Sequence, residues 1–479
     1  MYIDFKDISE HSDAFDICII GAGAAGIAMA VTLAQRGRRI LICEGGDRDY
    51  SERSQDCYQG ETVGDPYIPL RDTRLRYLGG STNHWGGICR PLDHYDFSAK
   101  IAARETAWPI GRETLEPYYR AAAKVLDLAP TPEDQPIEDS GIKRTYFSLG
   151  SPARLKDKYA DFLSESTTLA CCLTANLVAF ETQNGKASSA TFQNYQGDQR
   201  QVQARFFVFA CGGIENSRLL LWCNQQTQGR LIPQADTLGR YWMEHPHATV
   251  GKALIFEPAA LGLDEDYNVF LSPTAQSITS RQILNCGLRL HRMNAEVTQT
   301  LIDELAQQAP TLTGRLHAWQ AQGKRVHGAL LRAAWEQEPR YDNRIELSDE
   351  LDSLGVPRSR LVWQQSDLDR RTIRESMLLL GEYLRDKELG RLQMAEWLAD
   401  TPVKLPTDGE LAGRHHMGGT RMSLKAETGI VNPDCRLFAQ DNVFVAGSSV
   451  FASAGHANPT LTLVQLALRL CDHLESQLA

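Results

Sequence analysis

Apolar and polar positions at the start of the chain follow a β-α-β pattern. Residues 16–20 and 39–43 are short apolar runs, as in strands that are buried on both faces of a parallel sheet. Residues 24–35 between them are rich in alanine and are followed by Gly37, a residue that commonly ends a helix. Because a crossover helix makes its two strands parallel, this order predicts a sheet with helices on both faces.

Strand-like and helical stretches continue through the middle of the chain and return near its end. Alternating or continuous apolar runs predict strands at 173–180, 188–196, 203–213 and 442–447. Helical spacing of apolar residues predicts helices at 108–126, 212–222 and 459–475.

The sequence of region 246–410 differs in pattern from the sequence on either side of it. It has fewer buried-strand runs, a long polar helical region around 295–335 and strand-like stretches between 343 and 365. A chain of 479 residues is too long for one ordinary core. The sequence therefore predicts two domains, one assembled from 1–245 and 411–479 and a second formed by 246–410.

Composition and charge place the chain among ordinary globular proteins. Hydrophobic residues make up 42% and charged residues 23% of the chain, so a large core is easily built. The formal net charge is −10, and no run of lysine or arginine is interleaved with aromatic residues. We therefore expect neither a nucleic-acid surface nor an anionic-membrane surface.

The cysteines and the first residues of the chain indicate the cellular compartment in which we expect the protein. The 11 cysteines include no CxxC pair, and several stand in apolar runs, where a free thiol acts as a small apolar side chain. Residues 1–16 lack the charged-then-apolar order of an export signal, and no apolar run reaches membrane-spanning length. We expect a reduced, cytoplasmic protein without membrane insertion or a metal site; its oligomeric state is left open.

Three glycines between the first predicted strand and helix point to a nucleotide. Gly21, Gly23 and Gly26 form a GxGxxG pattern, and Glu44 ends the next strand. The first glycine permits a tight turn, the second lets the backbone approach a pyrophosphate, and the third lets helix and strand pack closely. Helix-end amides then face the phosphates, and Glu44 can accept hydrogen bonds from ribose. An ordinary tight turn would explain the three glycines by themselves. The full order of strand, helix, second strand and terminal acid favours a dinucleotide-binding site, but it does not distinguish NAD from FAD.

Two further glycine-rich segments favour FAD over a nicotinamide cofactor. One loop carries Gly79, Gly80, Gly86 and Gly87, and the segment 411–479 is again rich in glycine. A nicotinamide enzyme can complete its cofactor site within a compact N-terminal half. FAD is longer, and separated segments of this kind can enclose its isoalloxazine end.

Separated motifs give the chain a family resemblance. The stretches STNHW, ACGGIENSRLLL, HMGGTRM and ANPTLT occur in an order that resembles the glucose-methanol-choline (GMC) family of FAD-dependent oxidoreductases, in particular its pyranose-oxidase-like branch. The resemblance covers 16–245 and 411–479; within 246–410 only NRIELSDELDSLGVPR matches, loosely. It implies an α/β fold, with a Rossmann-like FAD-binding domain assembled from discontinuous segments and an α+β substrate-binding domain.

The resemblance also implies roles for individual residues. Family members transfer a hydride from an alcohol carbon to flavin N5 while a histidine takes the hydroxyl proton. His416 matches this base, and Asn458 matches the second residue that binds the same oxygen. His84 matches a residue that some members bond covalently to the flavin, so covalent attachment is left open. The other cofactor contacts that the resemblance implies are Gly80, Asn83, Trp85, Gly447 and Pro459.

Some of these residues have second explanations. Asn458 precedes Pro459, and an N-cap role alone would account for it. The start of that helix carries positive partial charge, which would stabilise an anionic flavin facing it. His415 should point away from the site if the backbone is extended, which gives it a supporting role. The other histidines considered are His245, His247 and His456.

The predicted activity is oxidation of an alcohol to a carbonyl by an FAD-dependent oxidase or dehydrogenase. The substrate expected is a sugar, glycoside, amino sugar or polyol, and the electron acceptor (oxygen, a quinone or another protein) is left open. One alternative is a flavin monooxygenase or reductase that uses NAD(P)H, but VFACGG is too short for the second nucleotide fingerprint it needs. Another is a non-catalytic flavin-binding protein, which would have no use for His416 and Asn458.

Overall fold

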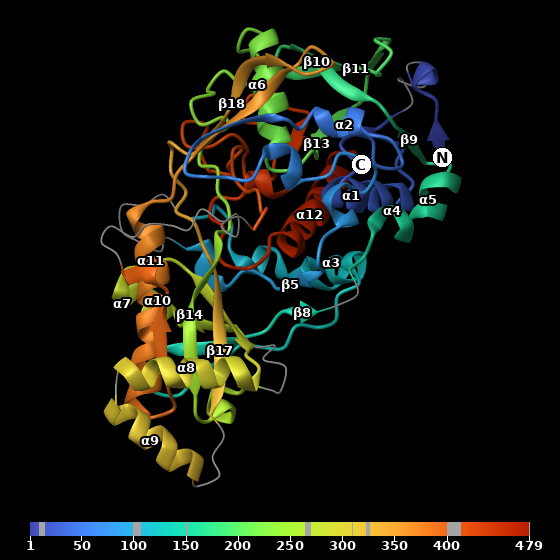
Figure 1. The fold of residues 1–479 in the computed structure, drawn as a ribbon. Coiled ribbons are helices and arrows are strands. Elements are labelled where there is room, and N and C mark those ends of the chain that lie inside the picture. Colours follow the sequence, from blue (N-terminus) through green and yellow to red (C-terminus); the bar gives the residue numbers. More distant parts are fainter. Residues whose placement is uncertain are drawn as a thin grey trace.

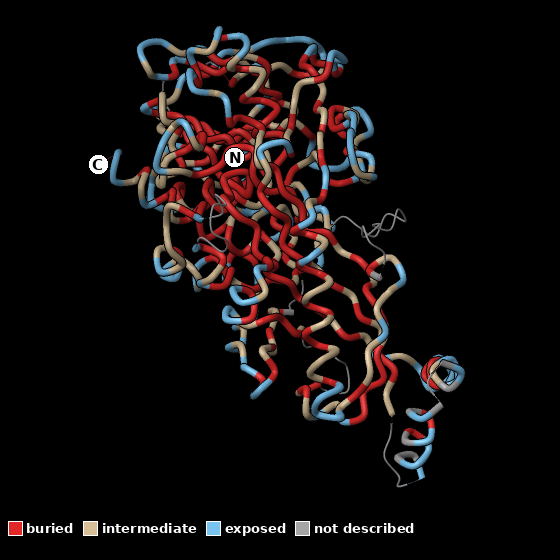
Figure 2. The backbone as a smooth tube through the Cα atoms, turned by 90° about the vertical axis from the view of Figure 1, so that its left-hand side faces the viewer, coloured by how far each residue is buried: buried red, intermediate tan, exposed pale blue. Residues whose placement is uncertain are grey.

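The chain folds into a larger lobe that holds both termini and a smaller lobe built around a second sheet (Figure 1). The structure is a computed structural model, and it describes residues 1–8, 15–98, 107–149, 152–263, 270–308, 310–321, 326–399 and 413–478. Buried backbone fills the body of the larger lobe and continues along the centre of the smaller one (Figure 2). Each lobe has an apolar core of its own.

A six-stranded parallel sheet forms the centre of the larger lobe, in the order β1-β9-β3-β2-β13-β21. Its strands, in that order, are Tyr2–Ile3, Leu169–Cys172, Ile40–Cys43, Ile17–Ile20, Phe206–Phe209 and Val443–Val445. Helix α1 (Ala24–Gln35) connects β2 to β3, so the predicted β-α-β unit is confirmed. Because β21 comes from the end of the chain, the sheet is assembled from discontinuous segments, and the predicted Rossmann-like α/β fold is confirmed.

Helices from distant parts of the chain pack beside this sheet. The C-terminal helix α12 (Thr460–Leu478) packs against α1 and against α3 (Tyr119–Leu126). The helix predicted at 108–126 is therefore shorter than expected. Two 3-10 turns precede α3, and Pro117 in the second of them has no backbone N–H to donate to a helix.

A hairpin from the middle of the chain belongs to the larger lobe. Strands β18 (Arg344–Leu351) and β19 (Pro357–Trp363) pair with each other, and β19 also pairs with β4 (Gly60–Gly64). Conversely, β6 (Gln135–Ile137) and β7 (Ile142–Thr145) lie at the edge of the second sheet. The lobes therefore do not follow the domain boundaries predicted at 246 and 410, because strand pairing between distant segments decides which lobe each one joins.

The smaller lobe is a seven-stranded sheet, in the order β20-β14-β17-β16-β15-β7-β6, with antiparallel pairing throughout. Its other strands are β14 (His247–Ile255), β15 (Phe270–Pro273), β16 (Cys286–Arg292), β17 (His327–Trp335) and β20 (Gly390–Met394). Helix α10 (Asp367–Asp386) covers one face, and its apolar side chains share a core with those of β16 and β17. On the other face, α8 (Ala295–Gln308) packs against β14 and β17, and His456 of the C-terminal segment packs on Gly287 of β16.

The region predicted to be helical around 295–335 is helical only in part. Helices α8 (Ala295–Gln308) and α9 (Pro310–Ala321) fill its first two thirds, but β17 is a strand with a partner on each side. The prediction was wrong there because HGALLRAAW is rich in helix-forming alanine and leucine, whereas pairing with β14 and β16 decides its structure.

Shorter elements complete the structure. The further helices are α2 (Glu52–Asp56), α4 (Leu155–Lys158), α5 (Ala160–Glu165), α6 (Glu215–Gln226), α7 (Ala275–Arg281) and α11 (Glu396–Ala399). The further strands are β5 (Ile88–Cys89), β8 (Ser148–Leu149), β10 (Asn176–Gln183), β11 (Lys186–Gln193) and β12 (Gln199–Val202). In the described part of the chain, none of the helices has both the length and the apolar character that crossing a membrane requires.

Candidate active site

A cavity of about 490 Å³ lies at the carboxyl ends of the central parallel strands. Ile20 at the end of β2, Cys43 at the end of β3 and Ala210 just after β13 line it. Ligands of open α/β sheets bind at this edge, because loops from several strands converge there. Much of the rest of the lining comes from residues within 73–76, 80–88, 175–177, 211–215, 413–416 and 458–463, together with Tyr58, Leu219, His247, Gly447 and Ser448.

The GxGxxG turn has the geometry that its glycines predict. Gly21 has a φ of +102°, and a Cβ there would lie 2.8 Å from Ala210 O. A Cβ on Gly26 would lie 1.9 Å from Gly21 O, so α1 can approach the strand only without a side chain at this position. Gly23 differs, because a Cβ there would meet nothing within 4 Å and the residue lines the cavity. The backbone at Gly23 is therefore open to a ligand.

Glu44 is buried at the edge of the same cavity. Its carboxylate oxygens accept hydrogen bonds from Ala22 N at 3.0 Å and from Gly46 N at 2.8 Å. These bonds tie the glycine turn to the end of β3 and fix the carboxylate in place. Each oxygen can accept a further hydrogen bond, so the position suits a ribose hydroxyl.

The glycine-dense loop 79–87 packs directly on the glycine turn. A Cβ on Gly80 would lie 3.2 Å from Gly23 Cα, so the two segments meet through their backbones. Trp85 lines the cavity, and Arg154 braces it by donating to Trp85 O at 3.0 Å. The glycine turn and the glycine-dense loop therefore lie side by side at one cavity.

Two polar residues of this loop lie differently. His84 lines the cavity, and its pKa is lowered by burial and then by the positive charges of Arg414 and Arg154. Its imidazole is therefore neutral near neutral pH, the state in which a ring nitrogen can act as a nucleophile. Asn83 does not line the cavity; its Nδ2 donates to Leu78 O at 2.8 Å, which stabilises the loop itself.

His416 lines the same cavity from the C-terminal segment. Its backbone is fixed: Ser448 Oγ donates to His416 O at 2.6 Å, and a Cβ on Gly213 would lie 2.7 Å from His416 Cβ. Its Nε2 is buried, and no described residue gives this nitrogen a hydrogen-bond partner. Burial first, and then the charges of Arg74 and Arg414, lower the pKa of the ring to about 3. A neutral ring with an unused nitrogen suits a proton acceptor.

Asn458 lines the cavity just before α12. Its Nδ2 donates to Ile88 O at 2.7 Å, which ties the C-terminal segment to the end of the glycine-dense loop. In the described chain no backbone amide donates to its Oδ1, so the contacts of α12 give the N-cap explanation no support. The first turn of this helix is instead closed by Leu463 N, which donates to Pro459 O at 2.9 Å.

Most of the residues predicted from the sequence meet at this cavity. Those that line it are Gly21, Gly23, Glu44, Gly80, His84, Trp85, His416, Gly447, Asn458 and Pro459. Gly26 and Asn83 do not line it, and both act through packing or loop stability instead.

Further histidines surround His416. His415 lines the cavity as well, with its Nδ1 3.2 Å from His245 Nδ1 and its ring centroid 5.8 Å from that of His247. The prediction that His415 points away from the cavity was therefore wrong. Glu244 joins the two segments, because its Oε1 accepts from His415 N at 2.6 Å, and burial raises its pKa to about 7.

His456 does not line the cavity. Its Nε2 lies 3.3 Å from Arg90 Nη1 and 3.5 Å from Ser272 Oγ, and burial lowers the pKa of its ring well below the ordinary value. His456 therefore lies between the C-terminal segment and the second sheet, away from the groups that line the cavity.

Sequence reasoning missed two arginines that line the cavity. Arg74 donates to Glu215 Oε1 at 2.9 Å, and Arg76 donates to Asn176 Oδ1 at 2.8 Å. Both come from RLRYLGG, where their spacing of two residues puts them on one side of an extended segment leading into the glycine loop. Fixed guanidinium groups beside the glycine turn favour an anionic ligand such as a pyrophosphate.

These residues fit FAD. The open backbone at Gly23 suits a phosphate, and the carboxylate of Glu44 suits ribose. The same cavity continues to His84, His416 and Asn458, whose polar groups would surround the reacting end of a long cofactor. A short nucleotide would leave these far residues without a ligand.

Comparison with protein families agrees with this site. The profile described as GMC oxidoreductase matches residues 339–467, and the profile described as FAD binding domain matches residues 16–54. The first match includes His416 and Asn458, and the second includes the glycine turn and Glu44.

The chain is also similar over nearly its whole length to characterised relatives. It is 22% identical to the fructose dehydrogenase large subunit of Gluconobacter japonicus, covering 98% of this chain and 99% of that protein. It is 23% identical to 2-methyl-1,2-propanediol dehydrogenase of Mycolicibacterium austroafricanum, covering 98% and 96%. Its fold resembles the crystal structure of pyridoxine 4-oxidase from Mesorbium loti, with a TM-score of 0.58, 15% identity, and coverage of 96% of this chain and 99% of that one.

Proposed function

Because the chain belongs to the GMC family of oxidoreductases, we propose that it oxidises a sugar or polyol hydroxyl to a carbonyl, with bound FAD as the hydride acceptor. The observation that carries this proposal is the buried His416 Nε2 without a described partner, on a ring that lines the cavity of the glycine turn. The names of two relatives, a fructose dehydrogenase and a propanediol dehydrogenase, support a hydroxyl substrate.

In the proposed reaction His416 takes the proton of the substrate hydroxyl. Its ring is neutral because burial and two arginine charges lower its pKa to about 3. Asn458 holds the same oxygen with its second Nδ2 hydrogen, since the first donates to Ile88 O. Bound FAD supplies the acceptor for the hydride that leaves the carbinol carbon.

A simple experiment tests the proposed function. Purified protein should be yellow, and its flavin absorption should bleach without oxygen when a reactive sugar or polyol is added without NAD(P)H. Bleaching only after addition of NAD(P)H would favour a reductase or monooxygenase. Flavin that no compound in a broad alcohol panel bleaches would favour a binding protein.

Two glycine variants separate FAD binding from folding. Gly23→Ala should fold, since a Cβ there meets nothing within 4 Å, but the added methyl group projects into the site. Crowding costs about 1–3 kcal/mol, which corresponds to roughly tenfold to hundredfold weaker FAD binding. Gly26→Ala should instead lower the stability of the apoprotein, because its Cβ would lie 1.9 Å from Gly21 O. FAD titration and melting of the apoprotein check both results; equal losses of stability would contradict the assignment.

We also propose that His84 bonds covalently to FAD. It lines the cavity, and burial and the charges of Arg414 and Arg154 keep it neutral and nucleophilic. After acid precipitation, the yellow colour should stay with the protein, and His84→Ala should release all of it. Asn83→Ala is the matched control, since this neighbour does not line the cavity, and it should keep the colour bound. Full release from the unaltered protein would rule out the bond.

The remaining parts of the proposal concern the cellular location of the protein, its electron acceptor and its branch of the family. All 11 cysteines are free, which supports a reducing, cytoplasmic location. Oxygen, a quinone or another protein reoxidises the cofactor. The retained HMGGTRM and ANPTLT motifs support a place in the pyranose-oxidase-like branch.

A further inference from the structure

A short antiparallel contact near the cavity contains a bulge. Met243 and Met417 exchange both backbone hydrogen bonds, from Met243 N at 2.8 Å and from Met417 N at 3.0 Å. The next backbone bond between the two segments runs from Gly413 N to His245 O at 2.9 Å. Between these bonds the first segment advances two residues and the second advances four. Residues 414–416 therefore bulge out of the pairing, a device that redirects side chains beside active sites.

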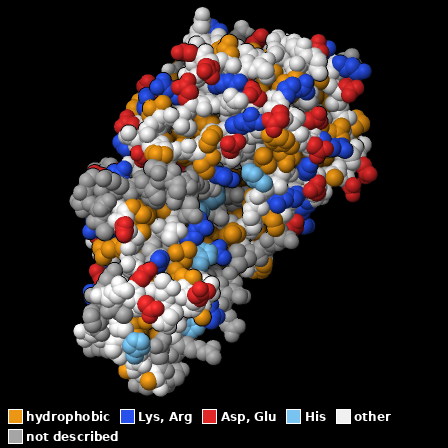
Figure 3. All heavy atoms as spheres, viewed as in Figure 1, with side chains coloured by type: hydrophobic (Ala, Val, Ile, Leu, Met, Phe, Trp, Pro, Cys, Tyr) orange, Lys and Arg blue, Asp and Glu red, His pale blue; other side chains and the backbone are white. Residues whose placement is uncertain are grey.

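The bulge carries the candidate base. Arg414, His415 and His416 all line the cavity. Arg414 has a φ of +60°, a left-handed conformation that is uncommon for residues other than glycine. The paired segment 243–245 leads directly into β14 of the smaller lobe, and histidine side chains are visible in the hollow where the two lobes meet (Figure 3). Because the bulge departs from regular pairing, its amides need acceptors other than the ladder partners.

The carboxylate of Glu244 supplies these acceptors. Its Oε1 accepts from His415 N at 2.6 Å and from His245 N at 2.8 Å. Arg414 also donates a backbone hydrogen bond to this carboxylate. One buried side chain therefore binds two consecutive amides of the bulge, directly before His416.

Glu244 is itself fixed in place. It is fully buried, and its backbone N donates to Gln337 Oε1 at 2.8 Å. The Tyr67 hydroxyl donates to Glu244 Oε2, and the Tyr67 ring packs edge-on against Trp242 with centroids 5.9 Å apart. The ring of Trp242 lies 5.7 Å from that of His416, at an interplanar angle of 35°. The same short segment thus supports the bulge through a carboxylate and the His416 ring through an aromatic contact.

We propose that Glu244 is a positioning residue: its carboxylate fixes the bulge so that His416 Nε2 faces the substrate hydroxyl. The proposal rests on the proposed function, in which His416 is the base. Glu244 does not line the cavity, so it acts through His416 and not on the substrate. Displacement of a reacting group by about 1 Å can cost roughly 100-fold in rate, so the position of the bulge matters as much as the presence of the histidine.

Positioning requires the acceptor oxygen and not the charge. A protonated Glu244 would carry its proton on Oε2, where the Tyr67 oxygen can accept it, and Oε1 would still accept from the backbone amides. Glutamine has nearly the same shape as this form, with its amide oxygen in the place of Oε1 and an N–H group toward Tyr67. Glu244→Gln should therefore preserve the bulge, whereas Glu244→Ala removes its support.

Two measurements on the FAD-loaded protein test the proposal. Anaerobic stopped-flow reduction, with the sugar or polyol that bleaches the unaltered protein fastest, gives the limiting rate and the apparent Kd. Hydrogen exchange of peptides that span 413–417 reports opening of the bulge. Glu244→Ala should lower the limiting rate about 100-fold, leave the apparent Kd nearly unchanged and speed this exchange. Glu244→Gln should lower the rate less than about tenfold, the effect of one neutral hydrogen bond, and keep the exchange slow.

Two further variants make the result specific. Asn442→Ala is the matched control, because Asn442 is buried and also ties two segments together, accepting from Ala187 N at 2.8 Å and donating to Ala187 O at 3.0 Å. It precedes β21, away from the cavity, so its loss should lower the melting temperature without changing either readout. Tyr67→Phe frees Oε2 and should change both readouts in the direction of Glu244→Ala by a smaller amount, which provides the test if Glu244→Ala does not fold.

The outcomes separate this proposal from the proposed function. An unchanged limiting rate in Glu244→Ala, even with faster exchange, would make Glu244 purely structural and overturn the proposal. A loss in Glu244→Gln as large as in Glu244→Ala would overturn it as well. Failure of every alcohol to reduce the flavin of the unaltered protein would remove the proposed function, and exchange in Glu244→Ala would still show whether Glu244 holds the bulge.

Discussion

His416→Ala should slow the reduction of FAD by substrate about 10²- to 10⁴-fold, the usual contribution of a positioned general base. The cofactor should stay bound, because His416 Nε2 has no hydrogen-bond partner among the described residues and the bond from Ser448 to the backbone of His416 does not depend on the ring. Anaerobic stopped-flow measurement of flavin bleaching checks the rate, and the absorption spectrum checks cofactor content. Reduction as fast as in the unaltered protein would remove His416 from the mechanism.

The neighbouring histidine and the pH profile make this test specific. His415→Ala should lose far less activity than His416→Ala, since the His415 ring contacts His245. The pKa of His416 is lowered to about 3, so its base form persists as the solution becomes acidic. The rate component that depends on His416 should therefore stay flat from about pH 8 to about pH 5, whereas an exposed histidine would lose it below about pH 6.5. A loss of this component near the ordinary histidine value would contradict the buried, neutral ring.

The local pattern of apolar residues was sufficient to predict an element whose structure depends mainly on its own residues. The strand-helix-strand order at the start of the chain is found within a residue of the predicted bounds, because buried parallel strands and their crossover helix carry distinct apolar patterns. Strand β17 and the hairpin β18–β19 show the limit. Their partner strands lie far away in the chain. Neither the alanine content of β17 nor the domain boundary predicted at 246 indicates which strands they pair with.

The same distinction applies to the candidate site. Gly21, Gly23 and Glu44 stand in a motif whose spacing has a direct physical reason, whereas the roles of His416 and Asn458 were implied by the family resemblance. The structure brings these five residues to one cavity. Arg289 and Arg332 stand in no motif, because they come to lie opposite each other only when β16 and β17 pair in one register. Glu244 is similar: its raised pKa comes from burial between two segments that are distant in sequence.

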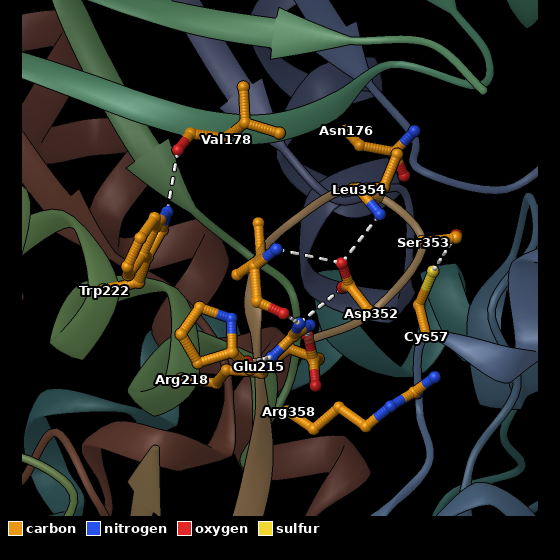
Figure 4. Close-up of polar contacts among 12 residues, drawn as sticks. Cys57, Asn176, Val178, Glu215, Arg218, Trp222, Asp352, Ser353, Leu354 and Arg358 are labelled. Carbon is orange, nitrogen blue, oxygen red and sulfur yellow. Dashed lines mark hydrogen bonds and ion pairs between the residues drawn. The ribbon is translucent and has the colours of Figure 1, made fainter. Parts of the chain in front are cut away.

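A buried ion-pair cluster fixes the β18–β19 hairpin against helix α6 in the larger lobe (Figure 4). Arg218 of α6 lies between two carboxylates, at 3.0 Å from Glu215 and 2.5 Å from Asp352. It also donates to Pro357 O at 2.6 Å, at the start of β19. Glu215 continues the cluster to Arg74, which lines the cavity. The hairpin turn and the cofactor site are therefore connected by consecutive ion pairs.

Arg218→Met should lower the free energy of unfolding by about 3–5 kcal/mol, the usual cost of leaving buried charges without their partner. Arg218 is only 1% exposed, so water cannot replace the guanidinium beside Glu215 and Asp352. Arg360→Met on the same hairpin is the control: its pair with Glu61 is 43% and 48% exposed, and such pairs contribute about 0–1 kcal/mol. Urea unfolding measures both variants, and similar losses would contradict the difference in burial. Of the two variants, only Arg218→Met should lower the affinity for FAD. Glu215 loses its bond to Arg218 in this variant and then holds Arg74 less firmly at the cavity.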